Sequence, residues 1–98
     1  MANQGLLSGV WVGSEAGVVT TNQMRVSTII FKGAAAGDGI TISDGSNTNE
    51  LMILSIPTNS DTKIVTFGGR GKVFPDGLYI KSISSSCKVM IYAESSIL

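Results

Sequence analysis

The feature that most constrains the fold is a series of short apolar segments, each bounded by turn-forming residues. In the clearest of them Ile40 and Ile42 alternate with the polar residues Thr41 and Ser43. A period of two is typical of a half-buried β-strand. We therefore predict an all-β chain, either a small antiparallel β-sandwich or a jelly-roll-like barrel, with about seven or eight short strands. The predicted strands lie in 8–13, 24–32, 39–45, 50–56, 62–68, 77–84 and 87–94.

One of these segments, 50–56, is apolar at nearly every position. A strand with apolar side chains on both faces is expected between two layers, so we expect this one to be buried. Pro57 ends it, because proline cannot donate to a strand ladder. Turns are expected at Asp44-Gly45 and Asp76-Gly77, which tolerate a positive φ.

The 98 residues fit a single domain. Helix is not favoured, because the one Ala-rich piece, 33–39, is bracketed by glycines and is too short to nucleate alone. Residues 1–9 and 95–98 stand apart as end segments. We interpret them either as frayed ends or as arms that dock on a neighbouring subunit. Their apolar residues are Leu6, Leu7, Ile97 and Leu98.

Charged residues make up only 14% of the chain, and seven basic residues balance seven acidic ones. Nucleic-acid binding depends on clustered Lys and Arg, so we expect no nucleic-acid partner. A net charge near zero favours association instead. No apolar run approaches the roughly 18 residues that span a bilayer, and no secretory signal is visible. We therefore expect no membrane partner and synthesis in a cytoplasm.

The glycine-rich segment 67–77, FGGRGKVFPDG, has the composition of a phosphate-binding loop. A Walker loop needs G-x-x-x-x-G-K-[ST] followed by a helix. Here Thr66 stands where the first glycine is required, and Val73 follows the lysine. We interpret the segment as a corner between strands, in which Arg70 and Lys72 are solvated or meet the carboxylates of a partner.

Side chains for catalysis are sparse. The absence of histidine excludes Ser-His-Asp and Cys-His arrangements and every imidazole zinc site. Ser-x-x-Lys occurs at 60–63 and 85–88, but its chemistry requires a helix, and in a strand residues three apart point to opposite faces. The single cysteine, Cys87, is expected to be a buried, inert thiol. We therefore expect no enzyme activity, no catalytic residue and no cofactor.

The segment 44–50, DGSNTNE, has oxygen-bearing side chains at alternate positions. Calcium takes six to eight oxygen ligands, and alternate loop residues can supply several of them. The segment lacks the acidic density of an EF-hand and its bidentate Glu at the twelfth position. A polar hairpin turn is favoured over a calcium site, and ion binding by this loop is left open.

Three aromatic residues, Trp11, Tyr79 and Tyr92, are of the type that stacks on sugar rings. Each lies within an apolar strand segment. Packing in the core or at a subunit interface is therefore favoured over carbohydrate binding.

From Phe31 to Tyr92 the chain resembles small structural proteins of tailed bacteriophages, of the marine and cyanophage type. The resemblance is carried by GDGITISDG, NELMILSIP, KIVTFGGRGKVFPDGLYI and KVMIYAE, in that order. It implies a virion subunit made in the host cytoplasm: a capsid decoration, cement or head-surface protein. The alternative is a tail or fibre protein, or a receptor-binding knob that binds carbohydrate. The family contributes no catalytic residues.

Partner contacts are expected at the two termini and in the segment 68–76. The implied partners are other copies of the chain, in a homo-oligomer such as a trimer, and other virion proteins such as the major capsid protein. Edge strands with few lysines to protect them favour such contacts. The expected contact residues are Leu6, Leu7, Arg70, Lys72, Phe74, Ile97 and Leu98.

Overall fold

The computed structural model describes residues 8–68 and 71–95. Within these ranges the chain forms nine β-strands and no helix, which confirms the predicted all-β fold. The strands are β1 (Ser8–Gly13), β2 (Gly17–Thr20), β3 (Met24–Lys32), β4 (Gly39–Ser43), β5 (Glu50–Ser55), β6 (Thr62–Thr66), β7 (Lys72–Phe74), β8 (Leu78–Ile83) and β9 (Lys88–Ser95).

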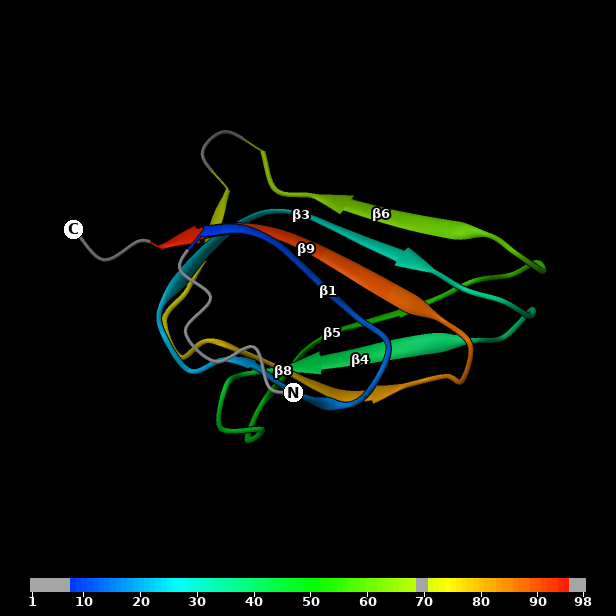
Figure 1. The fold of residues 1–98 in the computed structure, drawn as a ribbon, viewed down its shortest axis with the longest axis horizontal. Coiled ribbons are helices and arrows are strands. Elements are labelled where there is room, and N and C mark those ends of the chain that lie inside the picture. Colours follow the sequence, from blue (N-terminus) through cyan, green and yellow to red (C-terminus); the bar gives the residue numbers. More distant parts are fainter. Residues whose placement is uncertain (1–7, 69–70, 96–98) are drawn as a thin grey trace.

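The strands form two antiparallel sheets that pack face to face (Figure 1). Sheet A has the order β1-β9-β3-β6, and the short β7 pairs with β3 next to the span that β6 occupies. Sheet B has the order β2-β8-β4-β5. Among the described strands, the free edges are therefore β1 and β6 with β7 in sheet A, and β2 and β5 in sheet B.

The connectivity is that of one long hairpin wound around the sandwich. The β4–β5 pair forms its closed end, and outward from there β3 pairs with β6, β2 with β8, and β1 with β9. Successive pairs alternate between the two sheets. This is the arrangement of a jelly roll, so the predicted sandwich or jelly-roll-like fold is confirmed.

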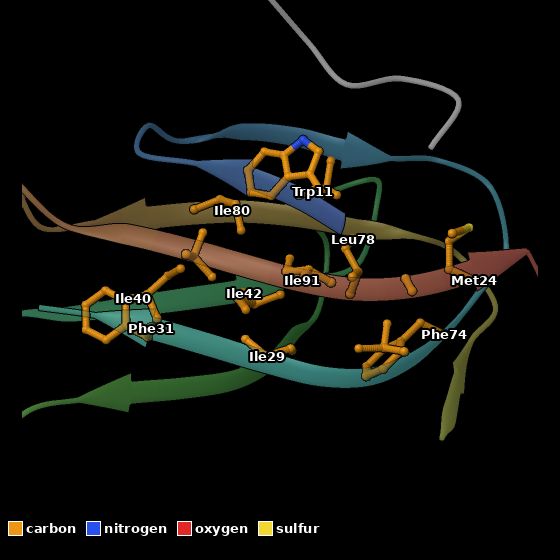
Figure 2. Close-up of a cluster of buried hydrophobic side chains, with 14 of the residues drawn as sticks. Trp11, Met24, Ile29, Phe31, Ile40, Ile42, Phe74, Leu78, Ile80 and Ile91 are labelled. Carbon is orange, nitrogen blue, oxygen red and sulfur yellow. The ribbon is translucent and has the colours of Figure 1, made fainter. Parts of the chain in front are cut away.

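The core lies between the sheets and is built from the inward-facing residues of the strands (Figure 2). In sheet A one inward row crosses all four main strands in register, from Trp11 through Ile91 and Ile29 to Val65. Each fully buried aliphatic or aromatic side chain contributes about 1.5–3 kcal/mol to stability. The largest fully buried side chains include Phe31, Met24, Ile29, Ile40, Ile42, Ile56, Leu78, Ile80 and Ile91.

The expectation that 50–56 is a buried strand is wrong. β5 is the last strand of sheet B and has only β4 as a neighbour among the described strands. Ile53 is 66% exposed and Leu51 is 40% exposed, whereas Met52 and Leu54 turn inward and pack against the core. The two-faced apolar pattern therefore marks an edge strand whose outer face is left uncovered by the described part of the chain.

The apolar pattern does not predict β2 or β7. β2 has four residues, and β7 has three, inside the segment that we interpret as a corner. The segment does change direction, but Lys72 to Phe74 pair with β3 on the way. Strands this short carry too few alternating positions to stand out from the glycine-rich sequence around them.

Both predicted Asp-Gly turns are present, for two different reasons. Gly77 has a φ of 83°, as predicted, and a Cβ there would also collide with the carbonyl oxygen of Thr20. In the β4–β5 turn the positive φ of 57° falls on Asn47 instead. Gly45 is needed there because a Cβ would collide with the carbonyl oxygen of Asp76.

Candidate functional site

Five of the seven expected contact residues lie outside the described residues: Leu6, Leu7, Arg70, Ile97 and Leu98. Of the other two, Lys72 is exposed on β7, with its Nζ 5.9 Å from the ring centroid of Phe74. Phe74 is only 3% exposed and packs in the core, with its ring in a T-shaped contact with that of Phe67. The ring faces inward from β7, so it offers little surface to a partner, and a partner contact at Phe74 stays a prediction.

The three aromatic candidates for sugar stacking differ in exposure. Trp11 is 6% exposed and belongs to the core, which confirms core packing for this residue. Its ring lies so close to Gly13 that a Cβ there would collide with it. Tyr79 is half-buried, and Tyr92 is 37% exposed on β9. Trp11 therefore offers no face to a sugar.

The 44–50 segment is a polar hairpin organised by Asp44. The Oδ1 atom of Asp44 accepts hydrogen bonds from the Thr48 N–H at 2.8 Å and the Ser46 hydroxyl at 3.1 Å. Its Oδ2 atom accepts one from the Asn49 amide at 3.1 Å. These bonds, led by that from Thr48, lower the pKa of Asp44 below its ordinary value. The carboxylate of this residue thus holds the loop together.

Cys87 lies in the turn before β9 and is 1% exposed, as expected of a buried thiol. Its Sγ donates a hydrogen bond to Oδ2 of Asp38 at 3.2 Å. Burial, followed by this contact with a carboxylate, raises the pKa of the Cys87 thiol. A raised pKa keeps the sulfur protonated and weakly nucleophilic, so this pair is a structural contact between loops.

The two Ser-x-x-Lys matches lie in turns and strands. Ser60 sits in the β5–β6 turn with a φ of 54°, and Ser85 is exposed in the β8–β9 turn. The helix that brings lysine beside serine in acyl-transfer enzymes is absent from the described part of the chain. Neither match therefore has the local geometry that its motif requires.

A row of four apolar side chains crosses the outer face of sheet A. Val12 on β1 lies opposite Met90 on β9, Met90 opposite Ile30 on β3, and Ile30 opposite Ile64 on β6. Val12 is 55% exposed and Ile64 is 62% exposed, and the two between them are partly exposed. We call these four residues the outer apolar row.

Tyr92 and two threonines extend the uncharged part of this face. Tyr92 lies opposite Thr28, and Thr28 opposite Thr66, one outward position along from the outer apolar row. At the other end of the face, Lys32 lies opposite Lys88. The outer face of sheet B is different, because Lys81 there donates to Glu50 at 2.6 Å in an exposed ion pair. The outer apolar row of sheet A, with Tyr92 and the two threonines beside it, contains no charged residue.

A groove opens along the side of the sandwich where β5 and β6 form the sheet edges. It has a volume of about 500 Å³. Its lining is apolar apart from Lys72 and combines side chains of the two edges with β7. The lining residues are Leu51, Met52, Leu54, Val65, Phe67, Lys72, Val73, Phe74 and Pro75.

No protein-family model, no curated protein and no solved structure matches this chain. Within residues 8–68 and 71–95 there is no helix long and apolar enough to cross a membrane.

The outer apolar row is a feature that we did not predict from the sequence. Its signal is a pair of adjacent apolar residues where strict alternation requires a polar one, as in Trp11-Val12, Ile29-Ile30 and Ile64-Val65. In a strand such neighbours point to opposite faces, so one of each pair must lie on the outside. Only the register shows that these outer residues line up across the sheet.

Proposed function

We propose that this chain is a non-enzymatic structural protein of a tailed-phage virion that acts through protein–protein contacts. Within the virion, its role is that of a capsid decoration, cement or head-surface protein. The observation that carries this proposal is the outer apolar row, which leaves Val12 and Ile64 more than half exposed. Contiguous apolar surface on a small domain marks an interaction site.

Exposing this face to water has a cost that a partner can remove. Burying apolar area stabilises by about 25 cal/mol per Å². A partner that covers the outer apolar row is stabilised by this free energy of burial. The four residues of the row carry no charge that would have to be desolvated. The net charge of zero adds no long-range repulsion between copies.

The virion assignment is supported by two further points. The sequence from Phe31 to Tyr92 resembles small structural proteins of tailed phages, and the jelly-roll architecture recurs in viral capsid domains. Lectin domains and cupins share that architecture, so the fold alone does not decide between functions. The proposed partners are other copies of the chain and other virion proteins such as the major capsid protein.

The experiment is mass spectrometry of virions purified from cells that make this chain, followed by co-sedimentation of the purified chain with particles that lack it. We expect a fixed copy number in virions and saturable binding to the stripped particles. Ile64→Lys places a charge in the outer apolar row and should weaken binding. Ser82→Lys, at an exposed position of sheet B, is the matched control and should bind normally.

A chain that is absent from purified virions and does not sediment with particles overturns the proposal. Sugar binding that is lost in Tyr92→Ala, without particle association, would favour the receptor-binding alternative.

A further inference from the structure

We propose that β5 is a self-association edge, along which a second copy of this chain adds its own β5 in antiparallel orientation. Sheet B of one copy would then continue into sheet B of the other. The β5 edge is a different surface from the outer apolar row, and its pairing does not depend on the virion assignment.

A free edge has a specific chemistry. β5 pairs with β4 on one side, and no described strand pairs with it on the other. An edge strand presents a row of backbone N–H and C=O groups that another extended strand can bond. The occupant that satisfies these groups is therefore an extended polypeptide.

The edges of the two sheets differ in how well they are protected. β2 has four residues and a register shift between Val18 and Thr20. β6 contains Lys63, and β1 contains Gly9 and Gly13. β5 has six residues, ELMILS, and a register shift at Leu51, but it contains no lysine, glycine or proline. Natural sheets protect their edges by shortness, bulges, lysine or proline. In β5 the bulge is confined to the Leu51 end, and residues 52–55 pair regularly with β4 and contain no lysine or proline.

A second copy fits this edge because β5 is complementary to itself. A twofold axis perpendicular to the sheet keeps each side chain on its own face, so outward Ile53 of one copy lies on the same face as Ile53 of the other. Inward Met52 and Leu54 from the second copy lie beside the groove of the first. Each β5 thus supplies an extended backbone that can pair with the free edge of the other copy, and apolar side chains that can cover those of the other copy.

Burial of apolar side chains along the groove would stabilise the dimer in addition to the backbone hydrogen bonds. Its volume is about 500 Å³, and Met52, Leu54 and Val65 are only partly buried along it. A strand added to β5 lengthens one wall and removes these side chains from water. Ile53, at 66%, has the highest exposed fraction among the exposed large hydrophobic residues of the described chain and lies in the middle of β5.

The test is sedimentation velocity of the full chain from low micromolar to millimolar concentration, with hydrogen exchange at both ends of that range. We expect a monomer–dimer equilibrium and slower exchange of β5 amides in the concentrated sample. Ile53→Lys should weaken dimerisation by about tenfold or more, because a charge now lies at the paired edge. Ser82→Lys is the matched control: its position is exposed on the same sheet but lies on β8, which β4 separates from β5.

Circular dichroism of each variant reports folding. If Ile53→Lys does not fold, Ile53→Thr keeps a β-branched residue and removes the apolar contact. A chain that stays monomeric at every concentration overturns the inference. So does dimerisation that Ser82→Lys weakens as much as Ile53→Lys, or that leaves the exchange of β5 amides unchanged. A dimer with protected β5 amides that fails to bind particles supports this inference and counts against the proposed function alone.

Discussion

The thiol of Cys87 donates a hydrogen bond to the carboxylate of Asp38, 49 residues away in the sequence, across 3.2 Å. The same Oδ2 atom accepts from the backbone N–H groups of Ala34 and Ala35. One carboxylate oxygen thus joins the β3–β4 loop to the turn that precedes β9. The contact gives the buried thiol a hydrogen-bond partner.

Burial and the raised pKa predict slow alkylation of Cys87 in the folded protein. If labelling requires global unfolding, iodoacetamide should react about a thousandfold or more slowly with native than with urea-unfolded protein. The measurement is the time course of adduct formation by mass spectrometry. Asp38→Ala should speed labelling by loosening the loop. Equal rates in the native and unfolded protein would contradict the prediction.

Acid should destabilise the fold through Asp38 and Asp44. Hydrogen bonds, led by those from the Ala35 and Thr48 N–H groups, lower the pKa of each carboxyl from its ordinary value of 3.8. A lowered folded-state pKa gives stability that is present above the unfolded-state pKa and is lost as the pH falls through the folded-state pKa. The urea midpoint should therefore fall as the pH drops below 3.8.

Asp44→Asn should flatten this acid dependence, since it removes one of the two titrating groups. The comparison is between urea midpoints of the variant and the parent over the same pH series. An unchanged dependence on pH would show that Asp44 does not contribute.

Gly77→Ala should destabilise the fold, because it combines a φ of 83° with a collision against the Thr20 carbonyl. We expect a loss of about 1–3 kcal/mol in the free energy of unfolding. Gly68→Ala is the control, since apart from its chain neighbours no described atom lies within 4 Å of a Cβ there, and its φ is not positive. Equal stability of the two variants in urea unfolding would refute this account.

Phe74→Ala should lower the free energy of unfolding of the single chain, because the ring is buried in the core of that chain. Truncating a buried phenylalanine costs about 3–5 kcal/mol, whereas a change at an exposed residue such as Lys72 stays within about 0.5 kcal/mol. Urea unfolding of Phe74→Ala and Lys72→Ala at low protein concentration measures both. A Phe74→Ala variant as stable as the parent would mean that this ring belongs to the surface after all.

Much of the fold is predictable from local pattern, because burial of one strand face leaves a period-two signal. The segments 8–13, 24–32 and 62–68 contain β1, β3 and β6 with little error. The signal fails for β5, since apolar residues on both faces indicate two covered faces whether or not a covering layer exists. It also fails for the outer apolar row, which arises only when four strands distant in sequence are set in register.

The candidate site is harder to predict than the fold for the same reason. Lys72 is exposed as expected, but the ring of Phe74, two residues along β7, turns inward. That inward direction follows from pairing with β3, and β7 is too short to be recognised as a strand beforehand. Asp44 illustrates the opposite case, since its loop chemistry is local and the polar hairpin is predictable from DGSNTNE alone.

The place of β9 in sheet A has a consequence for biosynthesis. β9 lies between β1 and β3, so the first of the described strands to leave the ribosome has no described neighbour in its own sheet until the last one follows. Sheet B, whose four strands all precede β9, can assemble first. The inward-facing apolar side chains of β1 and β3 stay exposed until β9 pairs with both strands. Nascent chains stalled before Lys88 should accordingly recruit chaperones, and release of the last strand should close the fold in one step.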